Sequence, residues 1–268
     1  MSRVAVRLTA ISLWLVLTFA SVAAAAGEIL EIPVADGVRT VHVFPAAGSD
    51  RRASPLVLVF HGLGDRAGNF SRAVALHKDW PQATVVYPEG LPRPDRRGMR
   101  GWQGFPGDDE NGDLALVDAL LEILPQRYPI DPDRVYVTGF SNGAHMTFNL
   151  LRERPCRFAA FAPVGALAEY VSEARTPRPV LYLFGREEPR EYTQAWQQTV
   201  VALAKLNRAT GEKREWSPGL TEFVPGPGGR VTVYGLYNAG HVWPIRGNEW
   251  IAGFLERFSL QDGCAAVR

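Results

Sequence analysis

A strand-to-helix junction built around one serine constrains the fold of this chain more than any other feature. Residues 134–138 (Arg-Val-Tyr-Val-Thr) are typical of a buried strand, residues 142–154 have helical apolar spacing, and Gly-Phe-Ser-Asn-Gly joins them at 139–143. Glycines two positions before and after the serine let helix and strand approach closely, and the sharp turn strains the serine backbone. The Ser141 hydroxyl is therefore expected at the carboxyl edge of a sheet, with a helix N-terminus behind it that favours negative charge.

Apolar, β-branched runs alternate with helical segments along the rest of the chain. Pro/Gly-rich residues 89–112 and 217–230 are predicted to be irregular surface loops, and Pro125 is predicted to end the first helix. The alternation predicts a single domain of the α/β class, with a mostly parallel central sheet and helices on both faces. Strands are predicted at 38–44, 56–60, 84–87, 134–138, 158–163, 180–184 and 231–236, and helices at 113–124, 142–154, 192–208 and 250–258.

The N-terminal residues 1–26 have the pattern of a signal peptide, which leaves 27–268 as the folded domain. Two arginines precede an apolar stretch over 8–22, and alanines, including those at 24–26, stand directly before Gly27. An uncleaved membrane anchor is the alternative, since the apolar stretch is only slightly shorter than a membrane span. The pattern predicts a secreted or periplasmic protein, with no stable membrane association after cleavage.

The composition argues against a nucleic-acid partner and against a bound metal. The formal net charge is +1, with 29 basic and 28 acidic residues and no sustained basic run, so no nucleic-acid partner is expected. In an oxidising compartment the two cysteines, Cys156 and Cys264, are predicted to form a disulfide; two free thiols are the alternative. They cannot build a metal site alone, and no His/Asp cluster at ligand spacing supports them, so no metal is predicted.

A serine nucleophile needs a histidine as base and a carboxylic acid to orient that histidine. In a fold with this order of elements the acid follows the serine along the chain, and the histidine follows the acid. His241 lies just after the last predicted strand, and the other histidines (His42, His61, His77 and His145) fit the role of base less well. The chain has no aspartate between Ser141 and His241, so the acid must be a glutamate. Glu188, or alternatively Glu187, follows the strand at 180–184; otherwise both are surface residues and the acid is missing.

An oxyanion hole needs two backbone N–H groups. We expect one from Asn142, directly after the serine, and one from Leu63 in His-Gly-Leu-Gly, which follows the strand at 56–60. Trp102 and Trp243 are candidates for substrate binding, because aromatic surfaces suit sugar or phenolic faces. Ordinary half-buried packing is an equally good interpretation of both.

Four stretches of the chain together resemble one protein family. They are Pro-Leu-Val-Leu-Val-Phe-His-Gly at 55–62, Asp-Pro-Asp-Arg-Val-Tyr-Val-Thr-Gly-Phe-Ser-Asn-Gly at 131–143, Phe-Ala-Ala-Phe-Ala-Pro-Val at 158–164 and Gly-His-Val-Trp-Pro at 240–244. In this order they resemble the polyhydroxybutyrate depolymerase and feruloyl/acetylxylan esterase family of secreted α/β-hydrolases. The resemblance covers nearly all of 27–268 and implies the α/β-hydrolase fold, a Ser–Asp–His triad, no cofactor and export.

The chain departs from that family at three positions. The family's acid lies in a His-Gly-x-x-Asp-Pro stretch, which here reads Phe-Gly-Arg-Glu-Glu-Pro at 184–189, so Phe184 replaces the histidine and Glu188 the aspartate. The longer Glu188 side chain must retract by about one methylene to reach His241. His145 stands where the family usually has a small or apolar residue.

The leading functional hypothesis is hydrolysis of carboxylic esters through an acyl-enzyme on Ser141. Plausible substrates are plant cell-wall feruloyl or acetyl esters and hydroxyalkanoate oligomers. A serine peptidase of the same fold is the alternative within enzymes. A non-catalytic binding protein that retains the fold is the alternative outside them, and the missing aspartate is its only support.

Overall fold

The central sheet of the computed structural model has ten strands within the described residues, which are 27–35, 37–48, 53–104, 112–261 and 264. The predicted signal peptide, 1–26, lies outside them. In spatial order the strands are β1 (Glu28–Val34), β2 (Gly37–Phe44), β4 (Thr84–Pro88), β3 (Ser54–Phe60), β7 (Ile130–Phe140), β8 (Ala160–Val164), β9 (Val180–Gly185), β12 (Thr232–Tyr237), β11 (Leu220–Pro225) and β10 (Ala209–Ser217).

The sheet is parallel in its centre and antiparallel at both edges. Neighbouring strands from β4 to β12 all pair in parallel, whereas β1–β2, β2–β4, β12–β11 and β11–β10 pair antiparallel. Every residue of β3, β8 and β9 is buried, as expected of strands covered on both faces. The predicted mostly parallel sheet is confirmed.

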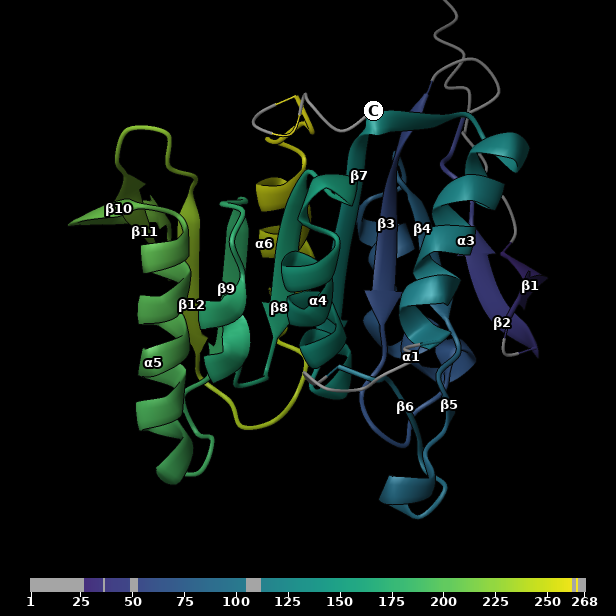
Figure 1. Ribbon diagram of the computed structural model, residues 1–268, viewed down its shortest axis with the longest axis horizontal. Helices are drawn as coiled ribbons and strands as arrows, with labels where there is room; N and C mark the ends of the chain where they lie inside the picture. Colours follow the sequence, from purple (N-terminus) through teal and green to yellow (C-terminus); the bar gives the residue numbers. More distant parts are fainter. Residues whose placement is uncertain (1–26, 36, 49–52, 105–111, 262–263, 265–268) are drawn as a thin grey trace, which may run out of the picture.

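Helices cover both faces of this sheet (Figure 1). One core contains Leu116, Met146 and Trp196, which come from α3 (Gly112–Arg127), α4 (Asn142–Glu153) and α5 (Glu191–Leu206). The other core contains Phe70, Leu76 and Ile251, which come from α1 (Ala67–Val74), α2 (Leu76–Asp79) and α6 (Gly247–Leu255). The predicted helical layers are therefore confirmed.

Short elements extend the connections at the carboxyl ends of the parallel strands. A small antiparallel ribbon of β5 (Leu91–Pro92) and β6 (Arg100–Gly101), with the 3₁₀ turn η2 (Pro94–Arg96) between its strands, projects beyond this edge in Figure 1. Further 3₁₀ turns are η4 (Glu169–Glu173), which follows β8, and η3 (Pro155–Arg157), which lies at the opposite edge, between α4 and the amino end of β8. The ribbon replaces part of the irregular loop predicted at 89–112.

Two local predictions are wrong. The helix predicted at 113–124 does not stop at Pro125 but continues as α3 to Arg127. Pro125 removes one helical N–H donor, but the Tyr128 N–H still donates to the Leu124 carbonyl at 2.9 Å and closes the last turn. Residues 217–230 are not irregular throughout: all of β11 lies there, and Pro218-Gly219 form a tight hairpin turn in which Ser217 pairs with Leu220. Gly219 has a φ of 87°, which explains the glycine.

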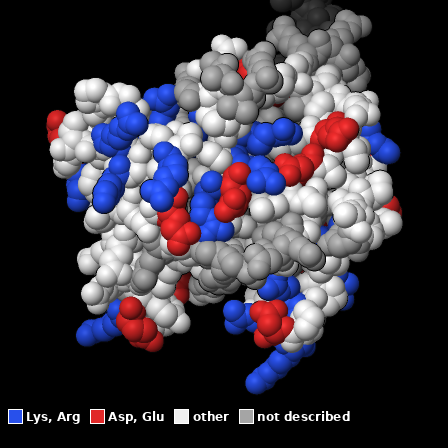
Figure 2. Space-filling view, viewed as in Figure 1, with Lys and Arg blue, Asp and Glu red and all other residues white. Residues whose placement is uncertain are grey.

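Charges on the surface are mixed. On the described part of the face in Figure 2, basic and acidic side chains lie next to one another. Arg154 pairs with Asp118 at 3.0 Å and Arg152 with Glu173 at 3.2 Å. Within the described ranges, no helix combines the length and apolar character needed to cross a bilayer.

A disulfide joins Cys156, in η3, to Cys264 near the C-terminus, which confirms the predicted pairing. The two residues are 108 positions apart, so the bond closes most of the second half of the chain into a loop. Closing a long loop removes conformational freedom from the unfolded chain and so stabilises the folded one.

Replacing both cysteines with alanine is therefore expected to lower the free energy of unfolding by about 2–4 kcal/mol. The measurement is a guanidinium titration followed by circular dichroism. A reducing agent should bring the wild-type protein to the same stability and leave the double variant unchanged. Equal stabilities of oxidised wild type and variant would contradict this expectation.

Candidate active site

Ser141 occupies the turn between β7 and α4 with φ 54° and ψ −114°, a backbone region that few non-glycine residues adopt. Its N–H donates a hydrogen bond to the Val164 carbonyl at 2.9 Å. A Cβ added at Gly139 would overlap the Gly143 carbonyl, and one added at Gly143 would overlap the Phe60 carbonyl. Both glycines are thus required by the close approach of strand and helix, as predicted from the sequence.

His241 reaches Ser141 from the loop after β12. The Ser141 Oγ lies 2.8 Å from His241 Nε2, in position to donate a hydrogen bond. The Tyr237 hydroxyl donates to the Val242 carbonyl at 2.8 Å and holds this loop against its strand. The Phe140 ring packs on the imidazole at a centroid distance of 4.8 Å. The hydrogen bond restrains the loop and the Phe140 ring restrains the imidazole.

Glu188 lies on the other side of the imidazole, in the loop after β9. His241 Nδ1–H donates to Glu188 Oε1 at 2.7 Å, and the carboxylate is only 5% exposed. Because β9 and β12 are parallel neighbours, their loops meet: the Glu187 N–H donates to the Ala239 carbonyl at 3.0 Å. Glu187 itself is exposed. Of the two glutamates considered, Glu188 is the one whose side chain contacts the base.

This arrangement can move a proton. A carboxylate that accepts the Nδ1–H bond leaves Nε2 unprotonated and aimed at the serine hydroxyl, and it stabilises the imidazolium that forms when the serine proton arrives. Shielding of the Glu188 carboxylate from water strengthens the interaction. Among the described residues, no group of three or more His, Cys, Asp or Glu side chains is placed to hold a metal ion.

The two predicted oxyanion donors, the Leu63 and Asn142 N–H groups, belong to segments that adjoin Ser141. A Cβ added at Gly62 would lie 3.6 Å from the Ser141 Cβ, so the loop after β3 passes directly beside the serine. Among the described residues, neither the Leu63 N–H nor the Asn142 N–H has an acceptor in the protein. Both are therefore free to bind a developing oxyanion.

His61 sets the direction of the Leu63 N–H. The Gly90 N–H donates to His61 Nε2 at 2.9 Å, so the ring proton is on Nδ1, which donates to the Gly62 carbonyl at 2.8 Å. Burial is the main cause that lowers the pKa of His61 and keeps the ring neutral. In a trans peptide the Gly62 carbonyl and the Leu63 N–H point in opposite directions. No role is predicted for His61 from the sequence, although its place after a buried strand and directly before Gly-x-Gly could have indicated one.

Trp102 is only 1% exposed, which favours packing, the other interpretation of this residue, over contact with substrate. Its Nε1–H donates to the His61 carbonyl at 2.9 Å. Its backbone exchanges hydrogen bonds with the Asn142 side chain at 2.7 and 3.2 Å. Trp102 thus joins the loop after β3 to the start of α4. Trp243 is partly buried edge-on to Phe140, and its contact with substrate stays a prediction.

His145, one turn after Ser141 on α4, lies beside Tyr170, with 3.2 Å between its Nδ1 and the tyrosine hydroxyl. Burial, followed by the charges of Arg96 and His241, lowers the pKa of His145 to about 4. His145 is therefore neutral at neutral pH. A neutral ring here adds no positive charge that would oppose formation of the imidazolium.

Residues 45–212, more than half of the chain, match the family model of the phospholipases and carboxylesterases. The chain belongs to the phospholipase/carboxylesterase family. It is therefore a carboxylic ester hydrolase, which confirms the predicted class of enzyme.

Individual proteins similar to this carboxylesterase are also named as esterases. NocK of Nocardia uniformis subsp. tsuyamanensis, described as an esterase, is 29% identical over 80% of this chain and 73% of its own. The bifunctional acetylxylan esterase/xylanase XynS20E of Neocallimastix patriciarum is 30% identical over 56% of this chain and 21% of its own length. The solved acetyl xylan esterase of Aspergillus awamori superposes with a TM-score of 0.65 at 15% identity, over 86% of this chain and 99% of that one. This likeness confirms the α/β-hydrolase fold.

The two glutamates of this carboxylesterase give a sharp test of the acid. Glu188→Gln is expected to lower kcat about a thousandfold or more, because an amide cannot stabilise the imidazolium and its NH₂ can reverse the tautomer. Glu187→Gln, the matched control, should change kcat less than about twofold. Steady-state kinetics on a p-nitrophenyl ester measure both. A large loss of kcat in Glu187→Gln, with none in Glu188→Gln, would identify Glu187 as the acid instead.

Proposed function

We propose that this carboxylesterase is an exported serine esterase that works through an acyl-enzyme, with Ser141 as nucleophile, His241 as base and Glu188 as acid. The observation that carries the proposal is the unbroken hydrogen-bonded series from Ser141 Oγ through the His241 ring to Glu188 Oε1, at 2.8 and 2.7 Å.

In the first half-reaction Ser141 Oγ attacks the ester carbonyl carbon while its proton moves to His241 Nε2. The carbonyl oxygen becomes an oxyanion and is bound by the N–H groups of Leu63 and Asn142. As the tetrahedral intermediate collapses, the bond to the alcohol oxygen breaks. His241 then returns the proton to the departing alkoxide, which leaves as the free alcohol.

In the second half-reaction water attacks the acyl-Ser141 carbonyl carbon and gives a proton to His241 Nε2. The same two N–H groups hold the second oxyanion. Collapse of this intermediate releases the carboxylic acid, and the proton on His241 returns to Ser141 Oγ. Glu188 keeps its charge throughout and stabilises the imidazolium in both steps.

The proposed substrates are esters carried on a polymer or oligomer, either acetyl or feruloyl groups of plant cell walls or hydroxyalkanoate chains. The imidazole of His241 is 48% exposed, so an ester on a bulky chain can approach it. Relatives named for action on such esters are the acetylxylan esterase/xylanase of Neocallimastix patriciarum and poly(3-hydroxyalkanoate) depolymerase C of Paucimonas lemoignei, which is 31% identical over 41% of this chain. The disulfide and the pattern of 1–26 support export.

The alternative of a non-catalytic binding protein loses its only support. That support was the missing aspartate, and the hydrogen bond between His241 and Glu188 supports a glutamate in the role of the acid. A peptidase activity of the same site is covered by the experiment below, because an amide substrate can be compared with its ester.

The test measures the mature protein, 27–268, on p-nitrophenyl acetate and butyrate, methyl ferulate, acetylated xylan, hydroxybutyrate trimers and a p-nitroanilide. A fluorophosphonate probe is used in parallel. We expect labelling and ester turnover, with kcat/KM for the esters exceeding that for the anilide by orders of magnitude. A folded protein that is neither labelled nor turns over any ester would refute the proposal.

A further inference from the structure

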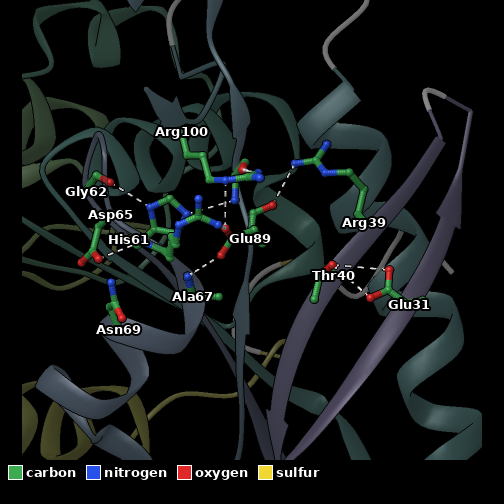
Figure 3. Close-up of polar contacts among 12 residues, drawn as sticks. Glu31, Arg39, Thr40, His61, Gly62, Asp65, Ala67, Asn69, Glu89 and Arg100 are labelled. Carbon is green, nitrogen blue, oxygen red and sulfur yellow. Dashed lines mark hydrogen bonds and ion pairs between the residues drawn. The ribbon is translucent and has the colours of Figure 1, made fainter. Parts of the chain in front are cut away.

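The carboxylate of Glu89 is the centre of a polar cluster behind the loop that carries Leu63 (Figure 3). Glu89 lies directly after β4, and its side chain is 14% exposed. Its Oε2 accepts a hydrogen bond from the Ala67 N–H at 2.6 Å, where α1 begins. Its Oε1 pairs with Arg100 at 3.1 Å and more loosely with Arg66 at 3.7 Å. One side chain therefore joins the end of a strand, the start of a helix and the β5–β6 ribbon.

The backbone of Glu89 is itself held in place. Its N–H donates to the Thr40 carbonyl at 2.9 Å. Its carbonyl accepts from Arg39 Nη2 at 3.3 Å, and that guanidinium also pairs with the buried Asp113 at 2.6 Å. In Figure 3 Arg39 and Arg100 lie on opposite sides of Glu89. The carboxylate thus projects from a fixed point of the sheet.

Two connections lead from this point to residues 61–65. The Gly90 N–H, next in the chain, donates to His61 Nε2, and His61 in turn fixes the Gly62 carbonyl. The Arg100 side chain donates to the Gly90 carbonyl at 2.9 Å, and the Arg100 carbonyl accepts the Gly64 N–H at 2.7 Å. The peptides on either side of Leu63 are therefore both held by groups attached to Glu89.

We propose that Glu89 is a positioning residue that fixes the direction of the Leu63 N–H through Arg100, Gly90 and His61; this rests on the proposed role of Leu63 in binding the oxyanion. Glu89 does not touch substrate. It acts by holding the ribbon and the loop in one relative position, so that the donor is in place before the charge develops.

Such a role has a kinetic signature that a purely structural role lacks. The N–H of Leu63 bonds strongly to the oxygen only when that oxygen carries negative charge, in the tetrahedral intermediates and their transition states. Misdirection of this donor lowers kcat and weakens binding of tetrahedral adducts, while ground-state binding, reflected in KM, stays nearly unchanged.

The test variant is Glu89→Gln, which keeps an oxygen to accept the Ala67 N–H and loses the charge that holds Arg100. A cavity of about 470 Å³ lies beside Glu89, so the change disturbs little close packing and the variant is expected to fold. Arg100→Gln breaks the same pair from the other side. Glu222→Gln is the matched control. Glu222 lies on β11, is 2% exposed and pairs with Arg214 of β10 at 2.8 Å, remote from the serine.

The measurements are kcat and KM on p-nitrophenyl butyrate, and the inhibition constant of phenylboronic acid, which forms a tetrahedral adduct with a catalytic serine. Glu89→Gln and Arg100→Gln are expected to lower kcat by about ten- to a hundredfold, less than the loss of a whole oxyanion donor. KM should stay within about twofold, and the boronate should bind more weakly by a similar factor. Glu222→Gln should match wild type.

The outcomes separate this inference from the proposed function. An active wild type whose Glu89→Gln variant has unchanged kcat overturns the role of Glu89 alone. A fall in melting temperature with kcat intact, or a rise in KM alone, also overturns it. Should Glu89→Gln not fold, Arg100→Gln decides by the same criteria. A wild type without ester turnover or fluorophosphonate labelling overturns the proposed function and this inference together.

Discussion

The strained backbone of Ser141 is the constraint on which the rest of the site depends. A positive φ at a serine persists only where the surroundings over-determine it. Here β7 leads into the turn, and α4 starts in close contact with the Phe60 carbonyl. The Ser141 N–H donates a hydrogen bond to the neighbouring strand β8. The two glycines beside the serine permit this approach. The result is a hydroxyl raised above the sheet edge, with the first N–H of α4 directly behind it.

Parallel pairing then delivers every other group to the same edge. The loops after β3, β7, β9 and β12 all leave the sheet at its carboxyl end, where ligands of open α/β sheets bind. Because β9 and β12 are adjacent, Glu188 and His241 meet although they are far apart in sequence. Because β3 lies beside β7, the loop with Leu63 passes next to Ser141. A short network behind that loop, centred on Glu89, holds its peptides in place.

The sequence was sufficient where one local pattern decided the structure. Continuous apolar runs predicted β3 and β9, and the Gly-Phe-Ser-Asn-Gly junction predicted the turn at Ser141. It failed at β10, whose residues are largely exposed and carry no apolar alternation, so only pairing with β11 reveals the strand. The strand order left Glu188 and Glu187 open, since both follow the same strand; the family resemblance favoured Glu188, and the structure shows its contact with His241. The burial of Trp102 and the contacts of Glu89 join residues distant in the chain, which no local pattern records.

The most direct test of the central claim is to identify the acylated residue during turnover. Protein comprising residues 27–268 is mixed with p-nitrophenyl acetate, quenched in acid within the first turnover and digested, and the masses of its peptides are measured by mass spectrometry. The account predicts a burst of p-nitrophenol close to one equivalent and an acetyl group on the peptide that contains Ser141. An acetyl group on a different side chain, or turnover that persists in Ser141→Ala, would contradict it.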